Sequence, residues 1–174
     1  MADRILIVYF SHDGEAYVNG NIVQLPVGNT KVAAGMAGAL TGADVFRLRP
    51  ASPYPNDYGQ TIETAQKELR AAARPELEGE LPDVRAYDAV ILGYPNWWGT
   101  IPMAMAAFLE RCDFRGKTIL PLCTNEGSGM GNSEEDINAL CPGADVRPGL
   151  AITGGRVRDA GPQIEMWLKT NNLI

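Results

Sequence analysis

Short apolar runs alternate with helical patterns along the whole chain, and this alternation limits the folds that it can adopt. Four of the runs are apolar throughout rather than at every second position, at residues 5–10, 89–93, 118–123 and 149–153. Continuous apolarity is typical of parallel strands that are covered by helices on both faces. The sequence therefore predicts an α/β fold built around a parallel sheet.

A fifth run, residues 43–49, has a different pattern. Val45, Arg47 and Arg49 alternate with Phe46 and Leu48, which predicts a strand with one face in water, at the edge of the sheet. Strands and helices then alternate along the chain, and right-handed crossovers are expected. We predict a doubly wound, five-stranded parallel sheet of order 2-1-3-4-5 with helices on both faces, in a single domain of residues 1–174.

Apolar residues recur with helical spacing between the predicted strands. The stripes are Val32, Met36 and Leu40; Ile62, Ala65 and Leu69; Met105, Phe108, Leu109 and Cys112; and Ile164, Trp167 and Leu168. Residues 134–140 are compatible with one further short helix, which would end at Cys141-Pro142-Gly143.

Composition excludes several classes of function. The net charge of -6 argues against a nucleic-acid partner, which would need a surplus of Lys and Arg. No apolar stretch approaches the roughly 20 residues that a membrane span needs, and the short run after Asp3 and Arg4 does not resemble a signal peptide. Three cysteines without CxxC spacing suggest reduced thiols and a cytoplasmic protein. With one histidine in the chain, no metal site is expected.

Ligands of open parallel sheets bind outside the carboxyl ends of the strands, where the strand order reverses. Three loops are expected to meet there, after strands 1, 3 and 4. Loop 1 is residues 11–30 and contains SHDG and GNT, loop 2 is YPNWWGTIP at 94–102, and loop 3 is TNEGSGMG at 124–131.

Loop 1 has the features of an anion site. It offers Ser11, Asn29 and Thr30 at the start of a helix, where hydroxyls and free backbone N–H groups bind anions without a cation. No Lys or Arg lies between Ser11 and Thr30, and GxxxxGK[ST] is absent. The loop therefore predicts a phosphate that is bound but not transferred. In the alternative interpretation Asn29 or Thr30 is only a helix cap.

Loop 2 places Trp97 and Trp98 directly after a buried strand, so indole surface is expected at the ligand-binding rim. A planar ring can stack there, although one of the two indoles is also a candidate for filling the core. Loop 3 is rich in glycine, which lets backbone N–H groups approach a ligand closely, but it lacks the GxGxxG spacing of dinucleotide-binding loops.

Together the three loops resemble those of the flavodoxin family, and the resemblance covers essentially the whole chain. Its most specific parts are YFS followed by GNT, and YPNWWGTIP, which is similar to the PxWWG-type second loop of bacterial flavodoxin-like proteins. The resemblance implies a flavodoxin-like fold that binds FMN non-covalently. The phosphate would lie in loop 1 and the isoalloxazine ring between loops 2 and 3.

The resemblance also assigns the residues that would bind FMN. The phosphate would be held by Ser11, Gly28, Asn29 and Thr30, and the ring by Trp97 and Trp98 with Tyr94, Pro95, Asn96 and Gly99 shaping that wall. The pyrimidine edge would be lined by Thr124, Asn125, Glu126 and Gly127, and His12 and Tyr17 could reach the cofactor as well.

Loop 1 departs from the compact T-G-x-T of the family, because thirteen residues separate SHDG from GNT. Within them, two apolar runs flank Asn19-Gly20, and Asn-Gly is the preferred two-residue hairpin turn. We therefore predict a β-hairpin insert at about residues 15–27. A rival alignment places the phosphate on residues 11–14 and leaves Asn29 and Thr30 as caps.

The resemblance implies a low-potential, one-electron carrier between a reductase and an acceptor enzyme, as a monomer or weak dimer and with no residue of its own that is catalytic. Glu126 would add negative charge near the flavin and lower its potential. The alternative is an FMN-dependent NAD(P)H:quinone reductase on the same fold. Arg47 and Arg49 could then hold a dinucleotide phosphate, although arginines on edge strands are more often solvated.

Overall fold

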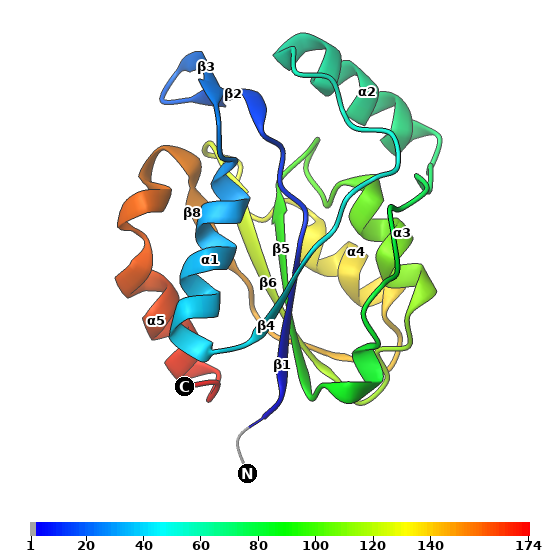
Figure 1. Cartoon of the computed structure of the whole chain (residues 1–174), viewed down its shortest axis with the longest axis vertical. Helices are drawn as coiled ribbons and strands as arrows, with labels where there is room; N and C mark the ends of the chain where they lie inside the picture. Colours follow the sequence, from blue (N-terminus) through cyan, green and yellow to red (C-terminus); the bar gives the residue numbers. More distant parts are fainter. Residues whose placement is uncertain (1–2) are drawn as a thin grey trace.

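A parallel sheet forms the centre of the computed structural model, which describes residues 3–174 (Figure 1). Its strands are β4 (Asp44–Arg47), β1 (Ile5–Tyr9), β5 (Ala89–Pro95), β6 (Thr118–Asn125), β7 (Asp145–Val146) and β8 (Leu150–Thr153). The order is β4-β1-β5-β6, and β7 and β8 both pair with the outer edge of β6. With β8 as the fifth strand, the predicted order 2-1-3-4-5 is confirmed.

Strand β7 was not predicted, because it has only two residues. Strand β7 pairs with the first part of β6, whereas β8 pairs with the last part. The two short strands therefore share the outer edge of β6. Pro121 of β6 and Pro148 between β7 and β8 lie at the interruption, and neither has an N–H to donate to a continuous ladder.

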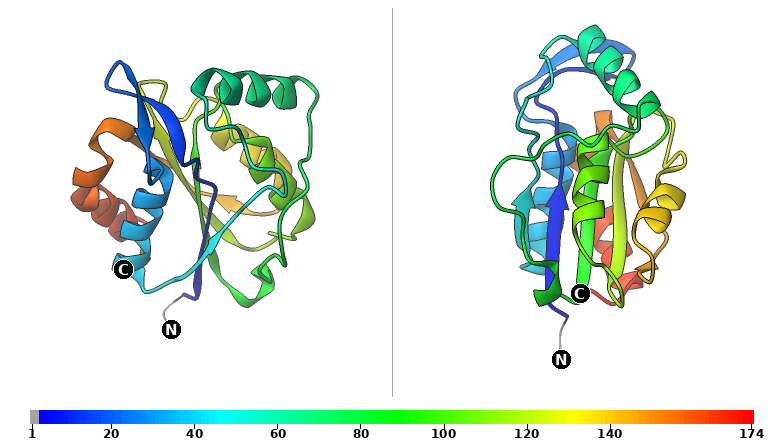
Figure 2. Two further views of the ribbon diagram at one scale, coloured as in Figure 1. Left: turned by 45° about the horizontal axis from the view of Figure 1, so that its top comes forward. Right: turned by 90° about the vertical axis from the view of Figure 1, so that its right-hand side faces the viewer.

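Four helices cover the two faces of the sheet. Helices α1 (Asn29–Thr41) and α5 (Gly161–Thr170) lie on one face, and α3 (Met103–Arg111) and α4 (Ser133–Leu140) on the other (Figures 1 and 2). In β1, Leu6 and Val8 belong to the core under α3, whereas Ile5 and Ile7 belong to the core under α1. This burial on both faces explains why the predicted strands are apolar throughout.

Helix α2 (Tyr58–Arg70) lies apart from the other four. It crosses beyond the carboxyl ends of the strands, and its main neighbours are β2 and α3 (Figure 2). Asp57 begins the helix, since its Oδ1 accepts a hydrogen bond from the Gln60 N–H at 2.8 Å. Two 3-10 turns, η1 (Val84–Ala86) and η2 (Gly154–Asp159), complete the chain. None of the helices within residues 3–174 combines the length and apolar character of a membrane span.

The predicted hairpin insert is present. Strands β2 (Gly14–Val18) and β3 (Asn21–Leu25) pair antiparallel as a separate two-stranded sheet. The turn residues Asn19 and Gly20 have φ of 52° and 84°, the left-handed pair that a two-residue hairpin requires. The hairpin stands above the amino end of α1, opposite α2 (Figure 1).

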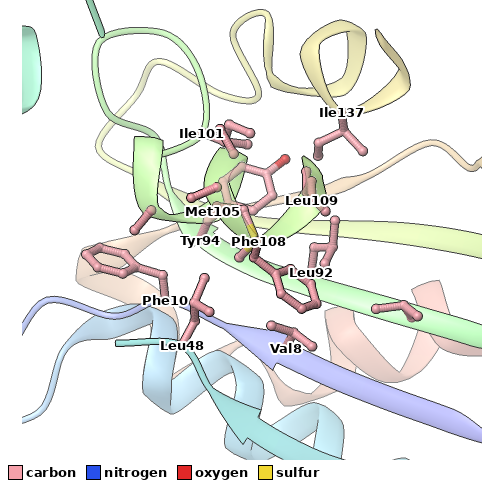
Figure 3. Close-up of a cluster of buried hydrophobic side chains, with 14 of the residues drawn as sticks. Val8, Phe10, Leu48, Leu92, Tyr94, Ile101, Met105, Phe108, Leu109 and Ile137 are labelled. Carbon is pink, nitrogen blue, oxygen red and sulfur yellow. The ribbon is translucent and has the colours of Figure 1, made fainter. Parts of the chain in front are cut away.

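The core between the sheet and α3 is dense and aromatic (Figure 3). Phe108 and Phe114 meet edge to face, and Tyr94 is fully buried among the apolar side chains. The Tyr94 hydroxyl donates to Ser133 Oγ at 2.8 Å, and Ser133 in turn donates to the Met130 carbonyl. Tyr94 therefore connects β5 to the start of α4.

We expect Tyr94→Phe to lower the free energy of unfolding by about 0.5–1.5 kcal/mol, because it removes one buried hydrogen bond and leaves the packing of the ring intact. Urea denaturation would measure this. Tyr87→Phe is the matched control, since the Tyr87 hydroxyl bonds to Asp44 at an exposed position. An equal or larger loss in the control would contradict the structural role given to the Tyr94 hydroxyl.

Candidate functional site

A cavity of about 460 Å³ opens at the carboxyl ends of β1, β5 and β6. Loops 1, 2 and 3 form its base, and the β2–β3 hairpin and α2 form its sides. Most of the predicted binding residues line this cavity: Ser11, His12, Tyr17, Asn29, Thr30, Pro95, Asn96, Trp97, Trp98, Gly99, Thr124, Asn125 and Glu126. Segments that are distant in sequence thus meet where the strand order predicted a ligand.

Three predicted residues do not line the cavity. Tyr94 points into the core, and Gly127 lies on the exposed side of loop 3. Gly28 is buried, and a Cβ at this position would lie 2.3 Å from Ser11 Oγ. Glycine at position 28 therefore allows both ends of loop 1 to close on each other.

The start of α1 is capped from the other end of loop 1. Gly28, as the N-cap residue, has no side chain for this purpose. Ser11 Oγ instead accepts a hydrogen bond from the Lys31 N–H at 3.1 Å, and Asp13 Oδ1 accepts one from the Gly28 N–H at 2.7 Å. Within the described chain the N–H groups of Asn29 and Thr30 have no acceptor, as expected for the first turn of a helix. These two groups are available to an anion in the cavity.

Hydroxyl groups add donors at the same place. The Thr30 and Thr124 side chains are buried, and their hydroxyl oxygens are 2.8 Å apart. One of the two donates to the other, so one hydroxyl proton remains for a ligand. The Ser11 hydroxyl accepts from Lys31 and therefore also keeps its proton.

An ion pair lies behind loop 1. Arg47 of β4 contacts Asp13 at 3.0 Å and donates to the Ser11 carbonyl. Partial burial opposes ionisation of Asp13, but the hydrogen bond from Gly28 and the contact with Arg47 outweigh it and hold the pKa of Asp13 below its ordinary value. Arg47, with only 15% of its side chain exposed, is paired rather than solvated.

His12 is the only histidine and lies between Trp97 and the hairpin base. Its Nε2 is buried without a hydrogen-bond partner. Burial lowers the pKa of His12, and the neighbouring Asp13 carboxylate offsets part of this shift. The imidazole is therefore held in its neutral form more strongly than a free histidine.

Loop 2 makes a tight turn that separates the two indoles. Trp97 and Thr100 exchange backbone hydrogen bonds, and the central residues Trp98 and Gly99 both have positive φ, 56° and 83°. Trp97 is half-buried against Phe10 and Tyr54, with ring centroids 5.1 and 4.9 Å away. Trp98 is 47% exposed, and its Nε1 donates to the Ile62 carbonyl of α2. Trp97 thus anchors the loop in the core, and Trp98 lies more exposed at the rim, held to α2 by its hydrogen bond.

Loops 2 and 3 are fixed to each other. Asn96 Nδ2 donates to the Gly129 carbonyl, and the Asn132 N–H donates to the Gly99 carbonyl. A Cβ on Gly131 would lie 2.3 Å from the Gly99 carbonyl oxygen, so this contact requires glycine. These contacts therefore fix the position of loop 2 relative to loop 3.

Glu126 joins loop 3 to the hairpin. Its Oε1 accepts from the Gly155 N–H at 2.9 Å, and its Oε2 accepts from the Asn19 N–H at 3.4 Å. The hairpin tip is thereby held beside the start of η2. The base of the hairpin is held on the other side, where Gln24 and Asn56 exchange two amide hydrogen bonds.

Sequence reasoning missed part of the lining. The additional residues come mainly from the hairpin and α2: Glu15, Ala16, Leu25, Tyr58, Thr61, Ile62, Ala65, Ser128 and Gly154. The stripe Ile62–Ala65 was recognised in the sequence, but periodicity does not reveal whether a stripe faces a sheet or a cavity.

The similarities to known proteins agree with this geometry. A family model described as Flavodoxin matches residues 4–171. A search of curated protein sequences gave no match. Among solved structures, a candidate flavoprotein from Bacteroides eggerthii DSM 20697 is 28% identical, with 97% of each chain covered and a TM-score of 0.77.

Two more distant structures share the fold. A flavoprotein in complex with FMN from Lactobacillus acidophilus NCFM is 18% identical, with 91% of this chain and 98% of that chain covered and a TM-score of 0.65. A candidate quinone reductase from Klebsiella pneumoniae is 14% identical, with 97% and 85% covered and a TM-score of 0.52.

The Asp13–Arg47 pair predicts a pH-dependent contribution to stability. Because the native-state pKa of Asp13 is lowered, its charge stabilises the fold above the ordinary aspartate pKa of about 3.9, and this contribution is lost as the pH falls through the native value. We expect Asp13→Asn to lower the free energy of unfolding by about 0.5–1 kcal/mol at pH 7, as for a partly exposed ion pair.

Urea denaturation at a series of pH values would measure the difference between Asp13→Asn and the unmodified protein. The two should converge as the pH falls below about 4. Asp159→Asn, at an exposed position, is the control. A loss that stays constant down to the lowest pH would show that the side-chain amide disturbs the loop rather than removing a charge.

Proposed function

The chain belongs to the flavodoxin family, and from this we propose that it binds FMN non-covalently and carries single electrons between redox proteins. The observation that carries the proposal is the start of α1, where unpaired N–H groups and hydroxyls face a cavity that also holds exposed indole surface. The same cavity combines a phosphate site with an aromatic wall, as a flavin nucleotide requires.

The phosphate site is supported by the donors of loop 1. Asn29 and Thr30 contribute N–H groups at the positive end of the α1 dipole, and Ser11 contributes a hydroxyl proton. Among the described residues no Lys or Arg lines the cavity. These groups fit a phosphate that stays bound, since no cation is present to support its transfer.

The geometry favours phosphate binding at Asn29 and Thr30 over the rival alignment at residues 11–14. In the rival alignment the phosphate would approach the Asp13 carboxylate, which already accepts from the Gly28 N–H. The phosphate and the Asp13 carboxylate are both negatively charged and would repel each other. Asp13 thus occupies the outer side of the helix start and leaves the cavity side to a ligand.

The indoles support the ring site. Trp98 is the stronger candidate for stacking, because it is the more exposed of the pair and is oriented by its hydrogen bond to Ile62. Loop 3 would line the pyrimidine edge with Thr124, Asn125 and Glu126. The Asn125 side chain accepts from the Gly127 and Gly129 N–H groups, which fixes the loop in position.

A bound flavin would supply the redox chemistry, and the protein would set its potential. The carboxylates of Glu15 and Glu126 line the cavity and no lysine or arginine does within the described residues, which favours a low potential by disfavouring added negative charge. His12 is the only cavity histidine, and its lowered pKa keeps it neutral. A carrier needs few groups for acid–base catalysis, in keeping with this set. Its partners would be a reductase and an acceptor enzyme.

The second candidate function is an FMN-dependent NAD(P)H:quinone reductase. It is supported by the shared fold of the Klebsiella pneumoniae protein and by a cavity that the β2–β3 hairpin and α2 flank on two sides. Arg47 would not serve a dinucleotide phosphate in such an enzyme, because it is paired with Asp13. Oxidation of NADPH by the purified protein with a quinone, without a partner reductase, would favour this function over the carrier.

The absorption spectrum of the purified protein tests the proposed cofactor. We expect flavin bands, and release of FMN on denaturation. A colourless protein that does not bind added FMN would contradict the proposal. Thr30→Val extends this test, because the Thr30 hydroxyl, which also bonds to Thr124, would face the phosphate that riboflavin lacks.

We expect Thr30→Val to weaken FMN binding by about 0.5–1.5 kcal/mol and riboflavin binding much less, since riboflavin lacks the phosphate. Fluorescence titration of the apo-protein with both flavins would measure the difference. Thr30→Ser keeps the hydroxyl and serves as the control. Equal losses for both flavins would show that Thr30 acts only in the packing of α1.

We expect substitution of Trp98 and substitution of Trp97 to affect different properties of the protein. Trp98→Ala is expected to weaken FMN binding by a few kcal/mol at most and to shift the flavin potential, because stacking adds about 0.5–1.5 kcal/mol beyond buried area. Trp97→Ala should instead lower the free energy of unfolding by about 3 kcal/mol, the lower end for loss of a packed indole that is only half-buried.

Flavin titration and thermal melts of both apo-variants would distinguish the two roles. Trp98→Phe keeps an aromatic ring and should retain most of the affinity. The assignment is reversed if Trp97→Ala loses FMN while Trp98→Ala loses only stability. Unchanged affinity and potential in both would disprove the aromatic wall.

A further inference from the structure

Helix α2 presents an apolar stripe to the cavity rather than to the sheet. Tyr58, Ile62 and Ala65 of this helix line the cavity, together with Leu25 at the end of β3. We call these four residues the α2 wall. None of them belongs to the three residue sets that the flavodoxin resemblance assigns to FMN.

Two polar side chains beside the α2 wall, those of Glu15 and Thr61, are already paired within the protein. The Glu15 carboxylate accepts from the Tyr58 N–H at 2.9 Å, at the start of α2. The Thr61 hydroxyl donates to the Pro55 carbonyl at 2.6 Å. A ligand against this wall would meet the side chains of Leu25, Ile62 and Ala65 and the Tyr58 ring, a surface that favours an apolar ligand, because buried polar groups need partners.

The charges of the cavity restrict the ligand further. The N–H groups at the start of α1 are unpaired donors for an anion, and the proposed FMN phosphate would use them. Among residues 3–174 the cavity lining includes no Lys or Arg, while the carboxylates of Glu15 and Glu126 are part of it. A second ligand with phosphate or sulfonate groups would find no positive partner here.

Aromatic rings flank the α2 wall on both sides. Trp98 is tied to α2 through the Ile62 carbonyl, at 2.9 Å. On the hairpin side, the Tyr17 and Tyr58 rings lie 6.3 Å apart at an interplanar angle of 27°. Flat surfaces next to an aliphatic floor suit a planar molecule better than a bulky one.

From these contacts we infer that the α2 wall binds a second ligand, a small, planar and uncharged ring compound, next to the cofactor. The inference rests on the proposed function, because FMN has to occupy the loop side of the cavity. It adds a small-molecule site to a protein whose proposed role needs only protein partners. It also excludes a nicotinamide dinucleotide as the occupant, since the phosphates of that molecule would be unmatched.

A pair of probes that differ only in charge tests the inference. Calorimetric titration of the FMN-loaded protein would compare 1,4-naphthoquinone with 1,4-naphthoquinone-2-sulfonate. We expect the uncharged probe to bind at least about tenfold more tightly, because the sulfonate would be buried without a partner. Equal affinities, tighter binding of the sulfonate, or no binding of either probe would overturn the inference.

Substitutions in the α2 wall test whether 1,4-naphthoquinone binds there. Ile62→Ser should weaken binding of 1,4-naphthoquinone by about tenfold, the loss expected when most of one aliphatic contact is removed. Ala65→Phe should block the probe by filling the space. Lys67→Ser, on the exposed side of the same helix, is the control and should leave the affinity unchanged.

FMN affinity and thermal melts of the same variants separate the possible outcomes. The inference holds if Ile62→Ser loses the probe while its FMN affinity changes much less. It is overturned if FMN affinity falls as much as probe affinity, since the α2 wall would then be a side of the FMN site. A protein that binds no FMN would disprove the proposed function, and the inference with it.

Discussion

The start of α1 is the point on which the site depends. A helix needs acceptors for its first N–H groups, yet Gly28 has no side chain to supply one. Ser11 and Asp13 provide them from the other end of loop 1, and Gly28 is the residue that lets that end come close enough. Because Ser11 accepts from Lys31 and Asp13 from Gly28, the N–H groups of Asn29 and Thr30 stay available to a ligand. A Ser or Asp at position 28 would accept from the N–H of Thr30 or Lys31.

The sides of the cavity are formed by the β2–β3 hairpin and α2. The hairpin is held at its tip by Glu126 and at its base by the Gln24–Asn56 pair. Helix α2 is held by Trp98 and lies beyond the strand ends, so its apolar stripe faces the cavity. The hairpin and α2 thus form two sides of the cavity, which stays open between them.

Local chemistry made much of the fold predictable. Residues 5–10 read as a strand because both faces of β1 are buried, and Asn19-Gly20 marked the hairpin because both turn residues need positive φ. Strand β7 was missed because a segment of two residues is too short to show a hydrophobic period. The Asp13–Arg47 pair was missed because the two residues are far apart in sequence, and neither residue type by itself indicates which partner it will contact.

The sequence by itself determined the strands, the hairpin and the three loops that carry the candidate site, since each depends on residues that are close together in the chain. It also determined that the phosphate donors of loop 1 come without a lysine or arginine. Only the tertiary structure decided which indole is the more exposed, which way the α2 stripe faces and how the start of α1 is capped. These depend on packing between elements far apart in sequence, and a local pattern of apolar and polar residues is the same whether its partner is a sheet, another loop or a ligand.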